Sequence, residues 1–360
     1  MVPELRALEE KFRDQPFVVV GVHSAKFDTE HLAENIRNAV MRYGIDHPVV
    51  VDQNMAVWQS YAVRAWPTMY LIDPEGYVLG YVSGEGAGPM LEDLIGKVIA
   101  EHRQKGTLSD APVGIRPERL LEGPRMLLYP GKVLVDTAGG RLFVADTGHH
   151  RIILSRLDGT GAETIGTGQH GRRDGDYATV QFDHPHGMAL EGETLYVADT
   201  ENHLIRAIDL GARTVRTVAG TGRQGRGPTQ PSPALQTALN SPWDLCFIGD
   251  RLFIAMAGNH QIGEFDRAED RIEVFAGTGR EALGDGPAKR AAFAQTSGLT
   301  TDGKTLYLAD SEVSCIRAIE VGGHDLVRTL VGGDLFDFGD VDGRAGAVRL
   351  QHPLGVCWGD

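Results

Sequence analysis

The sequence of 360 residues predicts a multidomain protein in which an α/β domain precedes an all-β repeat domain. Three observations predict this division. Helical periodicity alternates with short apolar runs up to about residue 104, and short apolar runs recur at a nearly constant period after residue 126. The stretch between them combines Gly, Pro and charge without periodicity, which is typical of a linker. We therefore expect domains over 1–104 and 126–360, with a linker over 105–125.

The first domain shows the alternation of an α/β fold that ends in an antiparallel pair. Helices are predicted over 3–12, 29–43, 54–61 and 89–103, and strands over 17–22, 47–51, 68–72 and 77–82. Asp28 or Thr29 is the expected cap of the second helix. The run FVVVGV from Phe17 is continuously apolar, as in a buried parallel strand. The residues Asp73-Pro74-Glu75-Gly76 suit a turn between the last two strands.

The second domain consists of repeated units. Four similar segments start 53, 57 and 54 residues apart: LFVADTGHHRI from Leu142, LYVADTENHLI from Leu195, LFIAMAGNHQI from Leu252 and LYLADSEVSCI from Leu306. Each unit holds four short β-rich runs separated by Gly and Asp turns, which predicts a β-propeller with four-stranded blades. Glycine-rich phrases such as GTGRQG precede another β run rather than a helix, so we interpret them as turns and not as phosphate loops.

Charge, hydropathy and cysteine content restrict the function. The net charge of −14 disfavours binding to nucleic acid or to anionic membranes, and no apolar run is long enough to span a bilayer. The three cysteines, Cys246, Cys315 and Cys357, lie far apart in apolar stretches. We interpret them as buried reduced thiols in a reducing, cytoplasmic compartment, because their spacing fits neither a disulfide framework nor a zinc site.

The loop before the third strand carries the first candidate site. Trp66, Pro67 and Thr68 occupy a sharp reversal of the chain before the strand 68–72, and we predict that the Trp66–Pro67 peptide bond is cis. A structural role in a tight strand start is the alternative to a role in binding.

The repeats carry a second group of candidates. Asp146, Asp199 and Asp310 follow the second strand of their units, where a short carboxylate can accept backbone N–H groups in a turn. Met256 replaces this aspartate in the third unit. Imidazole and amide residues follow the same turn, at His149, His150, Asn202, His203, Asn259 and His260, and others start inner strands, at His184, His186 and His352. The repeat itself explains these positions, so the sequence predicts no metal and no cofactor.

Two residues break the Pro-x-Gly pattern that HPHGM and HPLGV show at the start of a unit. Trp243 and Asp244 take those places in the third unit, and His186 lies at the corresponding place in the second. First strands line the mouth of a propeller channel, where binding sites gather. These three residues are therefore candidates for recognition, and packing within one blade is the alternative.

The phrases GVHSAKF, WPT, ADTGHHRI, VADTENHLIR, IAMAGNHQI and LQHPLGV, taken as a set, resemble the NHL-repeat-containing protein 2 family over essentially the whole chain. The resemblance implies a thioredoxin-like domain followed by a six-bladed NHL-repeat propeller. It also implies that Trp66, Pro67 and Thr68 shape a groove for a substrate strand or thiol.

In that family, a strand and a Cys-x-x-Cys-type motif precede the stretch that resembles PELRALE, which here begins at Pro3. We therefore expect an incomplete thioredoxin-like domain, which lacks its first strand and this motif, and a propeller of four blades and the start of a fifth at 356–358. The missing strand and motif are expected just upstream of Met1, and about 100 further residues are expected beyond Asp360.

These observations favour a protein-interaction scaffold that binds a protein or peptide partner and has no redox activity of its own. A dithiol mechanism needs two thiols, and this chain has no cysteine before Cys246. Three alternatives stay open: a thiol–disulfide oxidoreductase whose active cysteines lie upstream of Met1, a propeller hydrolase or lyase with a channel metal, and an RNA-binding propeller. The net charge makes the last the weakest.

Overall fold

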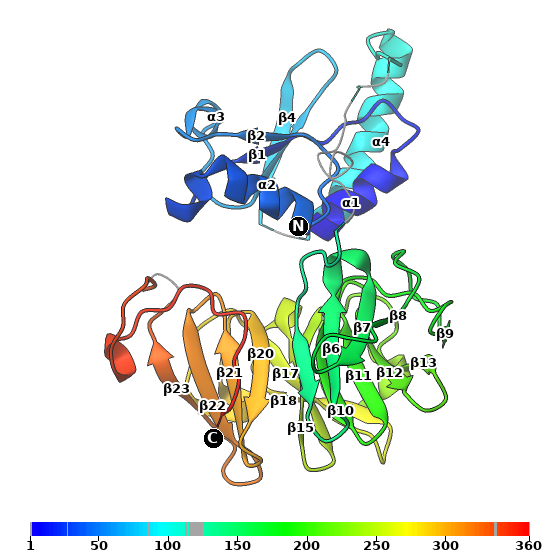
Figure 1. Ribbon diagram of the computed structural model, residues 1–360. Helices are drawn as coiled ribbons and strands as arrows, with labels where there is room; N and C mark the ends of the chain where they lie inside the picture. The colour runs from blue at the N-terminus through cyan, green and yellow to red at the C-terminus, as the bar shows by residue number, and fades with distance from the viewer. Residues whose placement is uncertain are drawn as a thin grey trace. The chain divides into compact units, whose positions relative to one another are not determined.

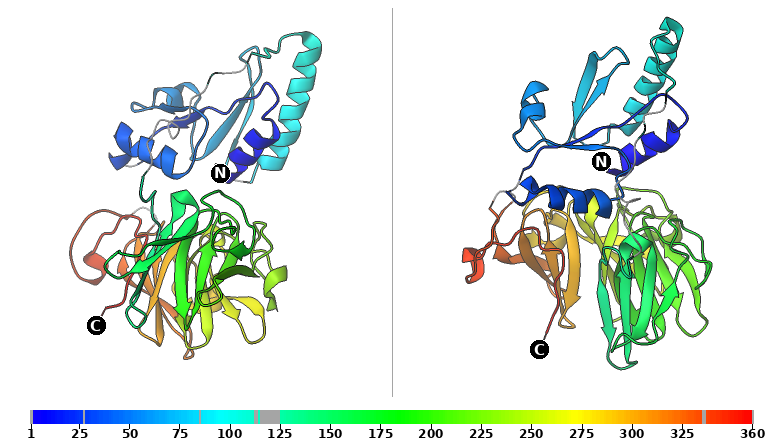
Figure 2. Two further views of the ribbon diagram at one scale, coloured as in Figure 1. Left: turned by 45° about the vertical axis from the view of Figure 1, so that its right-hand side comes forward. Right: turned by 45° about the horizontal axis from the view of Figure 1, so that its top comes forward.

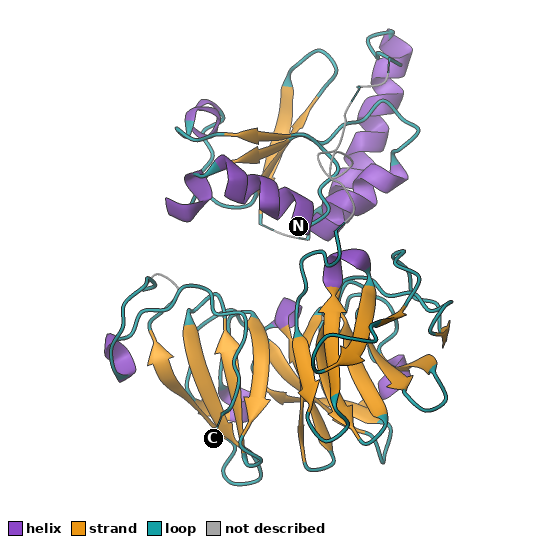
Figure 3. Cartoon of the chain, in the orientation of Figure 1, coloured by secondary structure: helices purple, strands orange, loops and turns teal. Residues whose placement is uncertain are grey.

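The computed structural model describes residues 2–26, 28–84, 86–111, 114, 125–334 and 337–359. The chain divides into two compact units, Met1–Pro124 and Arg125–Asp360, which we describe separately (Figure 1). The expected linker over 105–125 starts at the last residue of a helix, and most of it lies outside the described residues. Helices gather in the first unit and strands dominate the second (Figure 3).

The first unit contains four α-helices and four strands among its described residues. The helices are α1 (Val2–Lys11), α2 (Ala33–Arg42), α3 (Ala56–Ser60) and α4 (Gly88–Lys105), and the strands are β1 (Gly21–His23), β2 (Val49–Val51), β3 (Thr68–Ile72) and β4 (Val78–Ser83). Helices α1 and α4 pack through Leu8 and Phe12 against Leu91, Ile95 and Ile99, which recur every fourth residue on α4. This cluster is the core of the unit.

The strands of the first unit form two separate sheets. Strand β1 pairs in parallel with β2, and β3 pairs antiparallel with β4. The strand predicted over 17–22 is observed as β1, which spans only Gly21–His23. The side chains of Val18, Val20 and Val22 are 42%, 53% and 44% exposed. The expectation of a buried strand is wrong here because β1 has one neighbouring strand among the described residues, so its other edge and its side chains stay uncovered.

A second correction concerns α2. This helix begins at Ala33 with Leu32 as its N-cap residue, after a 3₁₀ turn over Asp28–His31. Neither predicted cap residue therefore caps α2, because the 3₁₀ turn already contains residues 28 and 29 and delays the start of the α-helix.

The second unit is a propeller of four blades (Figures 1 and 2). The first blade consists of β5 (Val133–Asp136), β6 (Arg141–Asp146), β7 (Arg151–Arg156) and β8 (Glu163–Ile165), and the second of β10 (Pro185–Glu191), β11 (Thr194–Asp199), β12 (Leu204–Asp209) and β13 (Thr214–Ala219). The third blade consists of β15 (Pro242–Ile248), β16 (Arg251–Met256), β17 (Gln261–Asp266) and β18 (Arg271–Ala276), and the fourth of β20 (Thr296–Thr301), β21 (Thr305–Asp310), β22 (Cys315–Glu320) and β23 (Leu326–Gly332). The predicted four-stranded blades are confirmed.

Short elements complete the blades. The two-residue strands β9 (Gly175–Asp176), β14 (Ser232–Pro233) and β19 (Gly286–Pro287) extend the outer edges of the last three blades. Helical structure in the described part of this unit is limited to 3₁₀ turns of three residues. First strands of successive blades contact one another, β5 with β10, β10 with β15 and β15 with β20, so these strands lie along the axis of the propeller.

Apolar side chains fill the space between blades. One cluster joins Phe143 and Ile152 of the first blade to Val197 of the second, and two further clusters join the second to the third and the third to the fourth. The middle strands of the last three blades are buried on both faces, which explains why their sequences are continuously apolar rather than alternating.

The Asp-Thr and Asp-Ser pairs of the repeat make two polar contacts each in the first, second and fourth blades. The carboxylates of Asp146, Asp199 and Asp310 are fully buried and accept the N–H groups of Leu128 (2.7 Å), Asp183 (2.7 Å) and Ala294 (2.8 Å), which precede the first strand of the same blade. The hydroxyls of Thr147, Thr200 and Ser311 donate to the carbonyls of Pro185 (2.7 Å), Pro242 (2.7 Å) and Pro353 (2.9 Å), at the start of the next unit.

Two of these aspartates also hold a buried arginine. Arg206 Nη1 lies 2.8 Å from Asp199 and Arg317 Nη1 lies 2.8 Å from Asp310, and both arginines are fully buried. In the third blade, Met256 and Gly263 take these two positions, and a Cβ placed on Gly263 would lie 3.2 Å from Met256 Cε. The methionine side chain thus fills the space that the guanidinium occupies in the other blades.

The segment after the fourth blade begins as the other blades do, but residues 337–359 form no strand. Pro353 accepts the Ser311 hydroxyl, and the Trp358 N–H donates to Thr300 Oγ1 at 3.1 Å, so the segment runs beside β20. Cys246 and Cys315 are buried as predicted, whereas Cys357 is exposed. The burial prediction is wrong for Cys357 because its segment is not paired as a strand of a sheet.

We expect Arg206→Leu to lower the free energy of unfolding by about 3–5 kcal/mol, because it leaves the buried Asp199 carboxylate without its cation. The matched double variant Asp199→Met/Arg206→Gly copies the third blade and should lose less stability than the single variant. Urea unfolding of the propeller measures both changes. A double variant less stable than Arg206→Leu would contradict this assignment.

We further expect one thiol per folded chain to react quickly with an aromatic disulfide reagent at pH 8. Burial raises the pKa of Cys246 to about 12 and that of Cys315 to about 11, so both stay protonated, and only Cys357 is exposed. Cys357→Ser should remove the fast phase, and unfolding in urea should expose the other two thiols. A fast phase that persists in Cys357→Ser would show that a blade opens.

Candidate functional site

The proline loop of the first unit is held from two sides. The Trp66–Pro67 peptide bond is cis, which confirms the prediction. The Trp66 ring packs against Trp58 with centroids 4.2 Å apart and the rings tilted by 33°, and its Nε1 donates to the carbonyl of Ser24 at 2.9 Å. Thr68 Oγ1 donates to the carbonyl of Ala65 at 2.8 Å and lies 2.9 Å from Ser83 Oγ. The loop therefore has a defined place beside the end of β1 and the start of β3.

A buried carboxylate fixes the helix that carries Trp58. Asp52 accepts the N–H groups of Val57 (3.0 Å) and Trp58 (2.9 Å) at the start of α3, and the hydroxyl of Ser24 (2.8 Å). Although burial opposes ionisation, these hydrogen bonds hold the pKa of the Asp52 carboxyl below its ordinary value. Asp52 thus links the strand segment before the groove to the indole that lines it, a role that the sequence pattern did not reveal.

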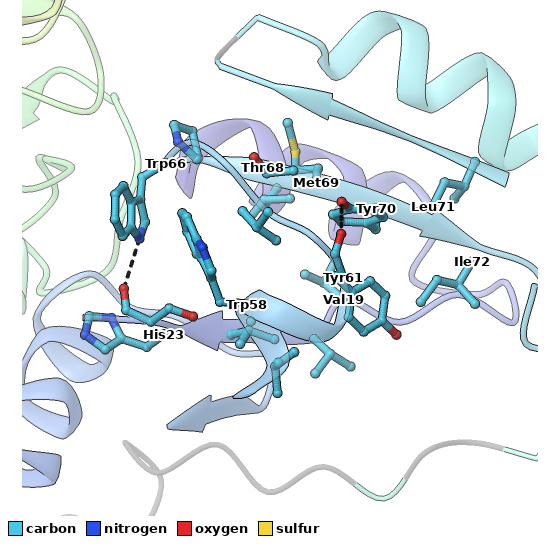
Figure 4. Close-up of a pocket in the computed structure, with 18 of the residues that line it drawn as sticks. Val19, His23, Trp58, Tyr61, Trp66, Thr68, Met69, Tyr70, Leu71 and Ile72 are labelled. Atoms are coloured by element: carbon cyan, nitrogen blue, oxygen red, sulfur yellow. Dashed lines mark hydrogen bonds between the residues drawn. The ribbon is translucent and has the colours of Figure 1, made fainter. Parts of the chain in front are cut away.

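Beside this loop lies a groove with a volume of about 700 Å³ (Figure 4). One wall is the segment 17–24 that includes β1, the other is residues 66–72 with β3, and Trp58 and Tyr61 of the α3 region contribute aromatic surface. Leu8, Leu91 and Ile95 of α1 and α4 also line it. Trp66, Pro67 and Thr68, predicted to shape a groove, all line this one.

The groove is apolar and has two strand edges facing it. Each of β1 and β3 has one neighbouring strand among the described residues, so the second edge of each is available to an added strand. Tyr70 donates its hydroxyl to the carbonyl of Tyr61, which fixes the two tyrosines on the same side (Figure 4). The lining supplies no thiol, because the first cysteine of the chain is Cys246. It offers backbone pairing and aliphatic contact.

The predicted channel-mouth residues meet at the axis of the propeller. The rings of His186 on β10 and Trp243 on β15 lie 5.5 Å apart at 61°. Asp244 is 6% exposed and accepts the N–H groups of Leu245 (3.0 Å) and Leu299 (2.8 Å).

A lysine that the sequence reasoning missed completes this group. Lys132 Nζ, just before β5, lies 3.0 Å from Asp244 Oδ2 and donates to the carbonyl of Leu354 at 3.2 Å. Burial raises the pKa of Asp244, and Lys132 counteracts this effect. The ion pair connects the first and third blades, which are not adjacent in the ring. Asp244 is thus engaged by protein groups, and only His186 and Trp243 of the predicted set present partly exposed rings.

None of the helices that the structure describes is long and apolar enough to cross a membrane.

The repeat aspartates Asp146, Asp199 and Asp310 have no exposed surface and contact backbone and basic side chains of their own blades. They lie one to a blade and form no common site.

Comparisons with known proteins agree with this two-domain architecture. A thioredoxin-like family profile matches residues 1–78, and an NHL repeat profile matches residues 182–208. The chain is 42% identical to the chloroplastic protein SUPPRESSOR OF QUENCHING 1 of Arabidopsis thaliana, in an alignment that covers 99% of this chain and 35% of that protein. It is 39% identical to NHL repeat-containing protein 2 of Homo sapiens and of Gallus gallus, in alignments that cover 99% of this chain and 53% of each relative.

The chain thus spans about half or less of the length of these relatives. A more distant similarity is to the thiol-disulfide oxidoreductase ResA of Bacillus anthracis. The alignment is 28% identical and covers 27% of this chain and 53% of ResA. The predicted resemblance is confirmed, and the chain is a homologue of NHL repeat-containing protein 2 that joins a thioredoxin-like domain to an NHL-repeat β-propeller.

Proposed function

We propose that this chain is a protein-interaction scaffold whose thioredoxin-like domain binds an extended polypeptide segment in the groove beside Pro67. The observation that carries the proposal is the groove of about 700 Å³ between two strands that each have one neighbour among the described residues. An inserted strand gains main-chain hydrogen bonds from both edges and places alternate side chains on the apolar walls.

The chemistry of the walls selects the partner. Val18, Val20 and Val22 are partly exposed, and apolar surface gathered around a concavity marks an interaction site rather than ordinary surface. Trp58 and Trp66 add rigid aromatic contacts, which are enriched where interfaces gain most of their energy. The preferred segment is therefore extended and rich in aliphatic side chains, without charge in its centre.

The propeller supports the same role with a second surface. His186 and Trp243 present partly exposed rings at the axis, where a protein or peptide partner would contact several blades at once. The net charge of −14 opposes nucleic acid and anionic lipid as ligands. Two buried, protonated thiols suit a reducing compartment, and we place the protein in the cytoplasm on that ground.

A peptide-binding experiment tests the groove. We expect a peptide with five aliphatic residues between terminal lysines to change the tryptophan fluorescence, because Trp58 and Trp66 line the groove. Val20→Glu should weaken binding at least tenfold, because an inserted strand would bury the carboxylate in an apolar site. The matched control is Val133→Glu on β5, at a residue that is 60% exposed and outside the groove. Equal affinities of the two variants, or no binding by the parent chain, would refute the groove as the site.

A thiol–disulfide oxidoreductase is the second candidate function. The cis Trp66–Pro67 loop beside an open groove favours it, as does the similarity of 27% of this chain to a protein named thiol-disulfide oxidoreductase. In this second hypothesis, the reactive cysteines belong to a segment outside the 360 residues, and the strand that carries them occupies the groove.

The chain of 360 residues should therefore not reduce insulin faster than a buffer control. Cys246 and Cys315 have raised pKa values, and Cys357 is exposed in the propeller unit without a second thiol within its segment. Insulin turbidity with dithiothreitol as reductant measures the rate, with Cys357→Ser as the control. Reduction that depends on any of the three cysteines would overturn the assignment of all three as non-catalytic.

A further inference from the structure

Three ionisable side chains meet where the first blade borders the second. His150 ends the turn between β6 and β7, and Asp183 and His184 precede β10. Asp183 Oδ1 lies 2.8 Å from His184 Nδ1 and 3.4 Å from His150 Nδ1. One potential ligand atom of each residue lies within 4.8 Å of the other two. The three side chains are 17–18% exposed, so they are shielded from bulk water but reachable from it.

The repeat explains the place of only one of these residues. His150, His203 and His260 occupy the same turn of successive blades, and their Nδ1 atoms accept the N–H groups of His184 (3.2 Å), Ser241 (3.1 Å) and Gln295 (3.0 Å). The carboxylate and the second imidazole are specific to the first junction. The corresponding pairs at the next two junctions are Asn240-Ser241 and Ala294-Gln295, which could not supply the same donors.

A further imidazole lies beside the cluster. The ring of His170, in the connection between β8 and β9, has its centroid 6.0 Å from that of His150, and the His184 ring is 4.6 Å from His150. Residues of three separate segments, 150, 170 and 183–184, are thus brought together by the packing of two blades.

The donors match what a zinc-type ion requires. Imidazole nitrogen and carboxylate oxygen are common zinc ligands, and at bond lengths of about 2.0–2.2 Å tetrahedral donors lie about 3.3–3.6 Å apart. The His150–Asp183 separation of 3.4 Å lies within this range, and the His184–Asp183 separation of 2.8 Å is shorter, so ligation requires a side-chain rotation that widens the second pair.

We propose that His150, Asp183 and His184 bind a divalent transition-metal ion, Zn²⁺, at the junction of the first two blades, with His170 as the fourth ligand. Binding replaces the hydrogen bonds that the three residues share by bonds to the ion and releases protons. The ion would fasten the two blades to each other, in addition to the Thr147–Pro185 hydrogen bond.

Equilibrium dialysis of the untagged chain against Zn²⁺, followed by elemental analysis, tests the site. All variants carry Cys357→Ser, so that the exposed thiol cannot bind the ion. We expect one equivalent of Zn²⁺ in this background and at least a tenfold weaker affinity in His184→Ala and in Asp183→Asn. Co²⁺ in place of Zn²⁺ should give the visible absorption of a tetrahedral site, and this absorption should disappear in both variants.

His260→Gln is the matched control, because it removes an imidazole with the same repeat position and the same backbone contact, at a junction that has Ala294-Gln295 in place of Asp183-His184. It should bind Zn²⁺ as the background chain does, even if it is less stable. Absence of Zn²⁺ from the background chain, or retention of a full equivalent in both His184→Ala and Asp183→Asn, would overturn the proposal.

Discussion

The buried Asp-Thr or Asp-Ser pair at the end of the second strand is the constraint on which the propeller depends. Its carboxylate accepts the N–H that precedes the first strand of its own blade, and its hydroxyl donates to the carbonyl that starts the next. Two adjacent side chains thereby hold the chain segments that enter two successive first strands. Because these groups are fully or almost fully buried, each lost partner would leave a desolvated polar group, so the arrangement tolerates little change.

The third blade shows how the ring accommodates the loss of this pair. Met256 and Ala257 stand in place of the aspartate and the hydroxyl residue, so neither fastening can form there. Asp244 supplies another polar link at this junction, because its Oδ2 accepts the N–H of Leu299 on the first strand of the fourth blade. Lys132 neutralises this buried carboxylate from the first blade. The departure of Trp243-Asp244 from the repeat pattern therefore has a structural cause, and His186 and Trp243 are the residues of that set best placed for recognition.

Pairing between strands decides the character of the thioredoxin-like domain. In the described part of this domain, each of the two sheets contains two strands, and the groove lies between the unpaired edges of β1 and β3. Both candidate functions depend on what occupies that groove, a strand of a partner protein in one case and a strand that carries cysteines in the other. The surrounding frame is the same for both, because Asp52, Trp58 and Ser24 position Trp66 without help from the occupant.

The sequence by itself determined what depends on local order. The repeat period located the second strands of all four blades, and the turn at Asp73–Gly76 located β3 with the observed bounds, because both signals lie within a few residues. Tertiary structure decided what depends on distant partners. The strand predicted over 17–22 is shorter in the structure, as β1, and Cys357 is exposed rather than buried. Both predictions failed because a strand is buried by its neighbouring strands and not by its own residue preferences. The Lys132–Asp244 pair and the cluster of His150, Asp183 and His184 join residues 30 to more than 100 positions apart, and only the packing of blades around an axis brings such residues within reach of one another.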